Sequence, residues 1–244
     1  MKENFGFVFQ RYEKKYLLTE DKYHNLCKDL SGYMQTDKYG LTTICNIYYD
    51  TSDFRLIRTS LEKPRYKEKF RVRSYGVPQS DSDVFLEIKK KYKNVVYKRR
   101  AVMTHEQSLK YLSNNIKPYD SQIMREIDYF FRLYELSPSV FLAYDRIAMF
   151  GIQDPELRMT FDTNIRSRFH DLNLAYGDSG ELLIDNEAKY LLEIKTLNSI
   201  PLWLTRILSK NEVYPTSFSK YGRVYEKHVN KVNLDHQKEN CTYV

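Results

Sequence analysis

Four basic residues stand at every second position of the segment P-R-Y-K-E-K-F-R-V-R-S-Y-G, residues 64–76. They are Lys67, Lys69, Arg71 and Arg73. Successive side chains of a β-strand point to opposite faces, so this spacing predicts one row of four cations on a single face. Like charges in a row repel each other, and the row is stable only in water or beside a strongly anionic group.

Two neighbouring segments repeat this pattern. Residues 84–91, V-F-L-E-I-K-K-K, place on one face Phe85, Glu87, Lys89 and Lys91. Residues 95–100, V-V-Y-K-R-R, do the same with Val96, Lys98 and Arg100. One interpretation is the basic, water-exposed face of an antiparallel sheet. Three successive stripes with Glu87 among them favour the alternative, a polar interior that holds polyanions while the apolar face packs outward under helices.

If the anion is phosphate, side chains must bind it. The chain contains neither G-x-x-x-x-G-K-[ST] nor G-x-G-x-x-G, the usual backbone cradles for phosphate. Arginine offers a planar fork to phosphate oxygens, and lysine acts as a point charge. Phosphoryl transfer needs positioning and charge stabilisation more than a protein nucleophile, and a closed barrel lined with cations can supply both.

Carboxylates on the same strand faces offer a route to a metal ion, because oxygen ligands suit Mg²⁺ or Mn²⁺ carried with a triphosphate. The candidates are Glu13, Glu87, Asp162 and Glu193. Each could instead only neutralise a neighbouring cation. For Glu13 and Glu87 both interpretations stay open. The five histidines show no metal-ligand spacing.

The composition favours an anionic partner. The 244 residues carry a formal net charge of +7, which suits nucleic acid, nucleotide, a phosphate polymer or an acidic membrane surface. The three cysteines are far apart and fit a reducing compartment. Since neither a signal peptide nor a membrane-spanning run is recognisable, we expect a cytoplasmic protein.

Alternation predicts further strands, and a helical period predicts helices between them. Strands are expected at residues 7–18, 42–51, 139–150, 157–163 and 189–196. Their faces group Arg11, Glu13 and Lys15; Leu142, Tyr144 and Arg146; Arg158, Thr160 and Asp162; and Leu191, Glu193 and Lys195. Helices are expected from residue 19, from the capping box at 104–107, over 121–134, after Pro201 and from about 217. We predict one domain, residues 1–228, followed by a polar tail, residues 229–244.

Taken in order, these motifs resemble the VTC domain, the catalytic domain of the vacuolar transporter chaperone polyphosphate polymerase, here in a stand-alone form. The resemblance rests on E-K-K-Y, Y-K-E-K-F-R-V-R-S-Y-G, V-F-L-E-I-K-K-K, V-V-Y-K-R-R, A-Y-D-R, L-R-M-T-F-D-T, L-E-I-K and F-S-K-Y, over residues 7–228. That family belongs to the triphosphate tunnel metalloenzymes, the superfamily of the CYTH domains. The resemblance implies an α+β fold, an eight-stranded antiparallel β-barrel tunnel with helices packed outside.

The resemblance also implies which residues form the site. The catalytic candidates, all of them phosphate-binding, are Lys15, Arg71, Arg73, Lys89, Arg146, Arg158 and Lys220. Lys98 and Lys69 are added as phosphate-binding residues only, and Glu193 would hold Mn²⁺ or Mg²⁺. Lys220 stands on a predicted helix, and only the resemblance places it at the tunnel.

One departure from the wider superfamily bears on the reaction. Hydrolytic relatives begin with E-x-E-x-K, whereas residues 11–15 read R-x-E-x-K, with Arg11 in place of the first carboxylate. Fewer carboxylates should weaken a second metal site and favour phosphoryl transfer over hydrolysis, although hydrolysis stays open.

We therefore expect a metal-dependent polyphosphate polymerase that transfers the γ-phosphoryl group of ATP to a phosphate or polyphosphate end and releases ADP. The alternatives are a tripolyphosphate or nucleoside triphosphate hydrolase in the same tunnel, and a non-catalytic polyphosphate sensor. RNA binding is disfavoured because Tyr12, Tyr16 and Tyr66 face away from the cations, so no nucleic acid partner is expected. A membrane-protein partner for the product and the oligomeric state stay open.

Overall fold

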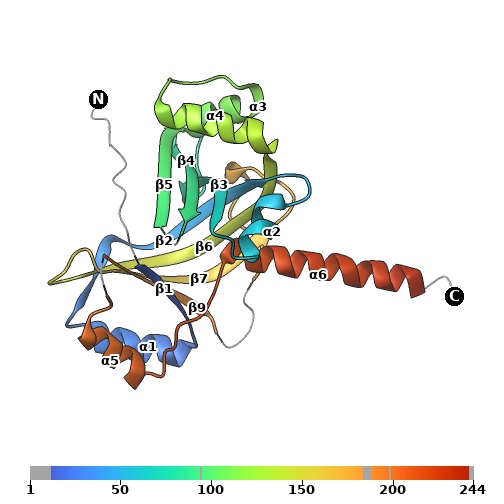
Figure 1. The fold of residues 1–244 in the computed structure, drawn as a ribbon. Helices are drawn as coiled ribbons and strands as arrows, with labels where there is room; N and C mark the ends of the chain where they lie inside the picture. The colour runs from blue at the N-terminus through green and yellow to red at the C-terminus, as the bar shows by residue number, and fades with distance from the viewer. Residues whose placement is uncertain (1–11, 94, 184–187, 198, 242–244) are drawn as a thin grey trace.

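Nine strands form one curved antiparallel sheet, eight of them in a continuous path, in a computed structural model that describes residues 12–93, 95–183, 188–197 and 199–241 (Figure 1). The hydrogen-bonded order is β1-β9-β7-β6-β2-β3-β4-β5, with the short β8 paired to β7. The strands are β1 Tyr12–Leu18, β2 Met34–Asp50, β3 Tyr66–Tyr75, β4 Asp83–Tyr92, β5 Val95–Thr104, β6 Ser137–Gly151, β7 Arg158–Arg168, β8 Glu181–Leu182 and β9 Tyr190–Thr196. The predicted α+β class and the eight-stranded antiparallel architecture are confirmed.

The sheet is not a strictly closed barrel, which corrects the expected ring of strands. β1 and β5 stand at the two ends of the hydrogen-bonded path through the described strands. The other edge of β1 is met by an isolated bridge, in which the Thr216 amide donates to the Lys15 carbonyl over 2.7 Å. A loop thus covers part of the edge that a closed barrel would pair with a strand.

Helices cover the outer face of the sheet in two groups. The helices of the described residues are α1 Glu20–Leu30, α2 Arg55–Leu61, α3 His105–Asn114, α4 Gln122–Tyr134, α5 Leu202–Lys210 and α6 Lys220–Cys241, with a 3₁₀ turn at Leu174–Tyr176. In Figure 1, α3 and α4 lie over one half of the sheet, and α1 and α5 lie over the other. The capping box predicted at Thr104 and Gln107 opens α3 as expected.

Apolar residues that alternate with the cations form the cores beneath these helices. Phe70, Leu86 and Ile88 are fully buried in the core that α4 covers with Ile127 and Phe130. A second core, beneath α1 and α5, contains the buried Tyr16. The apolar faces of the strands therefore point outward under helices, as the alternation predicts.

The first turns of α6 enter one end of the space that the sheet encloses. Phe218, Tyr221 and Val224 pack there against Leu142 and Leu191, which lie on the inner strand faces. α6 then continues to Cys241, past residue 228, where the sequence predicts that a polar tail begins. Helix periodicity in a sequence does not show whether a helix packs against the protein or extends away from it. The sequence therefore did not predict where α6 ends.

Candidate phosphate-binding tunnel

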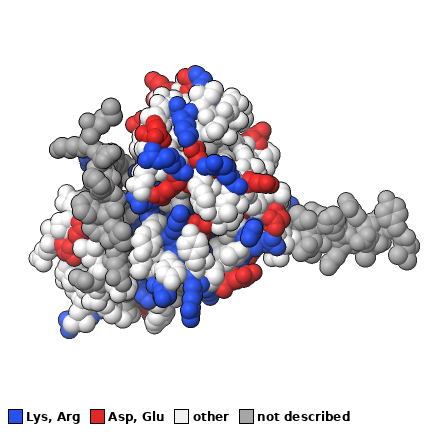
Figure 2. Space-filling model, turned by 45° about the horizontal axis from the view of Figure 1, so that its top comes forward, with Lys and Arg blue, Asp and Glu red and all other residues white. Residues whose placement is uncertain are grey.

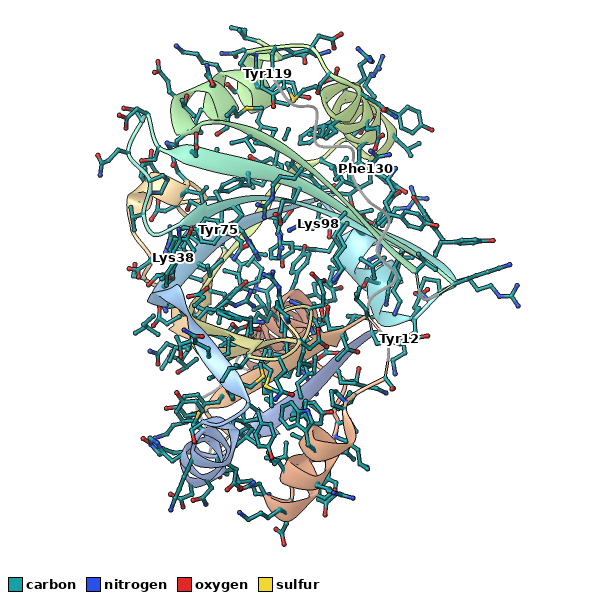
Figure 3. The ribbon with its side chains drawn as sticks, turned by 90° about the vertical axis from the view of Figure 1, so that its left-hand side faces the viewer. Tyr12, Lys38, Tyr75, Lys98, Tyr119 and Phe130 are labelled. Carbon is teal, nitrogen blue, oxygen red and sulfur yellow. The ribbon has the colours of Figure 1, made fainter. Side chains whose placement is uncertain are left out.

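The inner face of the sheet carries basic residues from seven of its described strands, and α6 adds one more. Strand pairing sets Lys69 opposite Lys89, Arg71 opposite Glu87, Arg146 opposite Asp162 and Lys15 opposite Glu193. Paired residues share a face, so the predicted residues on these strands all project to one side. Lys98 lies within the space enclosed by the sheet in Figure 3. In Figure 2, basic side chains gather around the middle of one face with acidic ones among them.

Glu87 lies at the centre of the first inner cluster and is 1% exposed. Arg71 donates to it from Nε over 2.9 Å, Lys98 Nζ lies 2.7 Å away, and Arg100 Nε donates over 2.8 Å. Burial raises the pKa of the Glu87 carboxyl, but Arg71 and the other cations around it outweigh burial and hold the pKa far below its ordinary value. Since cations engage both of its oxygens, neutralisation is the interpretation of Glu87 that this geometry favours over a metal ligand.

Tyrosine and asparagine side chains on β2 and β6 orient the two central arginines. Arg71 donates from Nη1 to the Tyr48 hydroxyl over 3.0 Å. Arg73, which is 6% exposed, donates to Asn46 Oδ1 and to the Tyr144 hydroxyl, both over 2.9 Å. We did not predict Asn46 and Tyr48 as site residues. In the sequence, Asn46 and Tyr48 alternate with the buried Cys45 and Ile47, and this alternation indicates that the two polar side chains share the opposite, inner face of β2.

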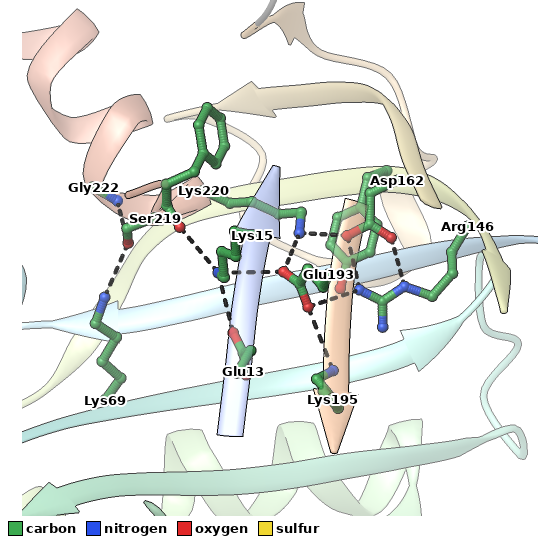
Figure 4. Close-up of polar contacts among 12 residues, drawn as sticks. Glu13, Lys15, Lys69, Arg146, Asp162, Glu193, Lys195, Ser219, Lys220 and Gly222 are labelled. Carbon is green, nitrogen blue, oxygen red and sulfur yellow. Dashed lines mark hydrogen bonds and ion pairs between the residues drawn. The ribbon is translucent and has the colours of Figure 1, made fainter. Parts of the chain in front are cut away.

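A second cluster joins four elements around Glu193 and Asp162 (Figure 4). Lys220 Nζ lies 3.1 Å from Glu193 Oε1 and also contacts Asp162. Arg146 donates two hydrogen bonds to the Asp162 carboxylate, from Nε over 2.6 Å and from Nη2 over 2.8 Å. Burial raises the pKa of the Glu193 carboxyl, yet Lys220 and then Lys15 and Lys195 lower it well below its ordinary value. The first residue of α6 is therefore brought to the carboxylates of β7 and β9, which no strand pattern could place.

Lys15 connects this cluster with β1 and with the segment before α6. Its Nζ donates to the Phe218 carbonyl over 3.0 Å and lies 3.3 Å from Glu193 Oε1 and 3.4 Å from Glu13 Oε1. Two carboxylate oxygens thus already enclose one cation. Arg11, the residue that departs from the hydrolase motif, lies outside the described residues.

Besides Arg73, whose partners are Asn46 and Tyr144, three predicted residues have no carboxylate partner within the described ranges. Lys69 Nζ donates only to Ser219 Oγ, over 3.4 Å. Lys89 and Arg158 are exposed and form no ion pair with the residues described. Arg158 pairs across the sheet with Lys195, away from the Glu87 cluster. These cations are free to meet a ligand without first breaking an ion pair.

The acidic residues of the tunnel fit a divalent metal that is held jointly with phosphate. Within the part of the chain that the structure describes, no group of three or more His, Cys, Asp or Glu side chains is arranged to hold a metal alone. Mg²⁺ is typically bound through one or two carboxylates together with substrate phosphates. Glu193, with Glu13 beside it around the Lys15 ammonium, offers such a pair.

Thr160 has a buried hydroxyl that contributes no hydrogen bond among the described residues. It is 9% exposed and stands opposite Glu193 in the β7–β9 pairing. A buried polar group without a partner costs stability, so Thr160→Val should raise the free energy of unfolding by about 1 kcal/mol. Urea unfolding measures this, with Thr163→Val, on the other face of β7, as the matched control. A loss of stability in Thr160→Val alone would contradict the geometry.

Solved structures with the same architecture include a "putative adenylate cyclase" from Bacillus halodurans, 14% identical, with 85% of this chain and 92% of that chain covered and a TM-score of 0.52. Another is a "putative adenylyl cyclase" from Hippeastrum, whose description names a dominant triphosphatase activity, 15% identical, with 86% and 92% covered and a TM-score of 0.51. At this identity the likeness concerns the fold. No curated protein sequence matches the chain.

The fold and its cation-lined interior define a triphosphate tunnel protein of the CYTH-like class. The chain belongs to the VTC domain family, whose family model matches residues 10–229. The family and the cation-lined interior support an enzyme that acts on triphosphate or polyphosphate. None of the helices within the described residues is both long and apolar enough to span a membrane.

Proposed function

We propose that the protein is a metal-dependent polyphosphate polymerase, which transfers the γ-phosphoryl group of ATP to a phosphate or polyphosphate end and releases ADP. The observation that carries this proposal is the convergence of basic side chains from seven of the described strands and α6 on one enclosed space, where Glu13, Glu87, Asp162 and Glu193 each have a basic neighbour. Such a site stabilises the charge of a transferring phosphoryl group.

Arginines with buried partners would fix the phosphate groups. Arg71 and Arg73 are oriented by Tyr48 and Tyr144, and Arg146 is held by Asp162, so their planar forks are already in place. Preorganised donors stabilise developing charge without a cost of reorganisation during the reaction. The lysines would add point charges along the phosphate chain. We assign this binding role to Lys15, Lys69, Lys89, Lys98 and Lys220. Arg158 would contact the phosphate chain at the end of β7 that pairs with Lys195 of β9.

Glu193 would hold the divalent metal, Mn²⁺ or Mg²⁺, with Glu13 beside it. When bound, such an ion neutralises charge on the phosphate oxygens and orients them. The residues of the chain would contribute the remaining positive charge, with Lys15 and Lys220 turned from Glu193 towards the phosphates. This assignment uses a place where oxygens of two carboxylates, Glu13 and Glu193, already enclose one cation, the Lys15 ammonium group.

Hydrolysis in the same tunnel is the second candidate, because the Hippeastrum protein of similar fold is described as a triphosphatase. A hydrolase needs a group that positions water against the phosphorus atom. The buried carboxylates Glu87 and Asp162 are held by arginines and are poorly suited to that role. This favours transfer to a phosphate acceptor over transfer to water.

An assay that follows ADP and free phosphate from ATP, with and without a short polyphosphate primer, separates the two reactions. A transferase produces more ADP than free phosphate, and the excess grows with primer. A hydrolase produces equal amounts whatever the primer concentration, and that result would overturn the proposal. Tight tripolyphosphate binding without any turnover would instead indicate a sensor.

Phosphate binding should weaken as the pH rises above neutrality. Burial, and then the nearby Lys89, lowers the pKa of Lys69 to about 7, and burial also lowers the pKa of Lys98 to about 7. A bound polyanion favours the protonated lysine, so binding takes up protons above that pH and the affinity falls there. Calorimetric titration with tripolyphosphate in buffers of different ionisation enthalpy counts these protons. Lys69→Gln should take up fewer protons, and an unchanged count would contradict this prediction.

A further inference from the structure

A double row of basic residues runs out of the tunnel along β3 and β4. Lys69 lies opposite Lys89, and Lys67 lies opposite Lys91 in the strand pairing. Beyond the strand ends, the Lys93 amide donates to the Arg65 carbonyl over 3.0 Å, which brings a third basic pair to the end of the row. We call Arg65, Lys67, Lys91 and Lys93 the outer cation ladder.

The outer cation ladder differs from the inner clusters because no carboxylate neutralises it. None of its four residues forms an ion pair with any described residue, and Lys67 Nζ donates only to the Ser60 carbonyl, over 3.1 Å. Like charges directly opposite each other destabilise a sheet. Burial and then Lys91 lower the pKa of Lys67, as expected of a cation that lacks a counter-charge. The ladder is therefore electrostatically incomplete without an anion.

The ladder leads from the enclosed space to the molecular surface. Lys67 and Lys91 are half-buried, whereas Arg65 and Lys93 are exposed. The six residue steps from Arg71 to Arg65 span roughly 20 Å at the rise of an extended strand. A triphosphate bound at Arg71 is too short to reach the outer pair. A longer phosphate chain would reach both, with one negative charge available for each unit along the row.

We propose that the outer cation ladder binds the part of an inorganic polyphosphate chain that lies outside the tunnel. This inference rests on the proposed function, since it needs a phosphate chain that begins in the tunnel. Lysine tolerates variable phosphate spacing because it acts as a point charge, which suits a polymer that slides. The ladder holds the chain near the tunnel between successive transfers, so longer products are made before the chain dissociates.

The double variant Arg65→Gln/Lys93→Gln tests the ladder without touching the tunnel interior. The matched control is Lys38→Gln/Arg206→Gln, which removes the same charge from exposed positions on β2 and α5. Dissociation constants are measured for tripolyphosphate and for long-chain polyphosphate at several salt concentrations. We expect the ladder variant to bind long chains about tenfold more weakly, with a shallower salt dependence, because it has lost two phosphate contacts. Binding of tripolyphosphate should match that of the unmodified protein.

Three results would overturn the inference. If long chains bind the ladder variant as tightly as the control variant, the ladder does not contact them. If both ligands lose affinity equally, the substitutions act inside the tunnel. If single-stranded RNA displaces long-chain polyphosphate as effectively as unlabelled polyphosphate does, the ladder is a nucleic-acid surface. Failure of the unmodified protein to bind tripolyphosphate would instead refute the proposed function itself.

Discussion

Arg71→Ala is expected to abolish turnover while the protein stays folded. We expect a loss of about a thousandfold or more, because a charge-stabilising arginine contributes at least that much to phosphoryl transfer. The fold should survive because Glu87 keeps Lys98 and Arg100 as partners after Arg71 is removed. The measurement is steady-state release of ADP from ATP, together with circular dichroism and thermal unfolding of the same sample.

Arg206→Ala provides the control for Arg71→Ala, since Arg206 is an exposed arginine on α5, outside the tunnel. It should retain full activity. If a folded Arg71→Ala protein keeps the activity of this control, Arg71 does not bind the transferring phosphate, and the assignment of the tunnel arginines is wrong.

Glu87→Gln is expected to destabilise the free protein strongly. Removal of this charge leaves Arg71, Lys98 and Arg100 beside one another with no carboxylate between them. Loss of one member of a buried ion pair typically costs about 3–5 kcal/mol in the free energy of unfolding. Tripolyphosphate should restore much of that stability in the variant, because it returns negative charge to the same cations. Urea unfolding with and without tripolyphosphate measures both effects.

The pH dependence of unfolding gives the same residue a second test. The pKa of Glu87 is lower in the folded protein than in the unfolded chain, where an ordinary value is about 4. The stability that Glu87 contributes is therefore fully present above about pH 4 and is lost as the pH falls below it. The gap in stability between the unmodified protein and Glu87→Gln should narrow on acidification. A variant as stable as the unmodified protein at pH 7 would contradict the role of Glu87.

Local alternation in the sequence predicted which side chains enter the tunnel. Lys67 to Arg73 alternate with the buried Glu68, Phe70 and Val72, and this period is set by strand geometry alone, whatever the topology. The same reasoning grouped Arg146 with Tyr144 and Glu193 with Lys195. Residues that lie on regular strands were thus accessible to prediction from the sequence.

Features that depend on tertiary packing were not accessible in the same way. Lys220 reaches Glu193 because α6 packs at one end of the tunnel. The sequence pattern of this helix does not indicate that contact. Helical spacing places Lys220 and Arg223 on the same side of α6, yet of these two only Lys220 is buried. Whether β1 and β5 meet likewise depends on strand lengths and on the segment at Thr216, which fold-level contacts decide.

The measurement that tests the central claim most directly follows the γ-phosphoryl group itself. The purified protein is incubated with ATP labelled at the γ-phosphate, Mn²⁺ and a short polyphosphate primer, and long chains are then separated from free phosphate. Polyphosphate polymerase activity predicts label in chains longer than the primer, in step with the release of ADP. Label that appears only as free phosphate would contradict it.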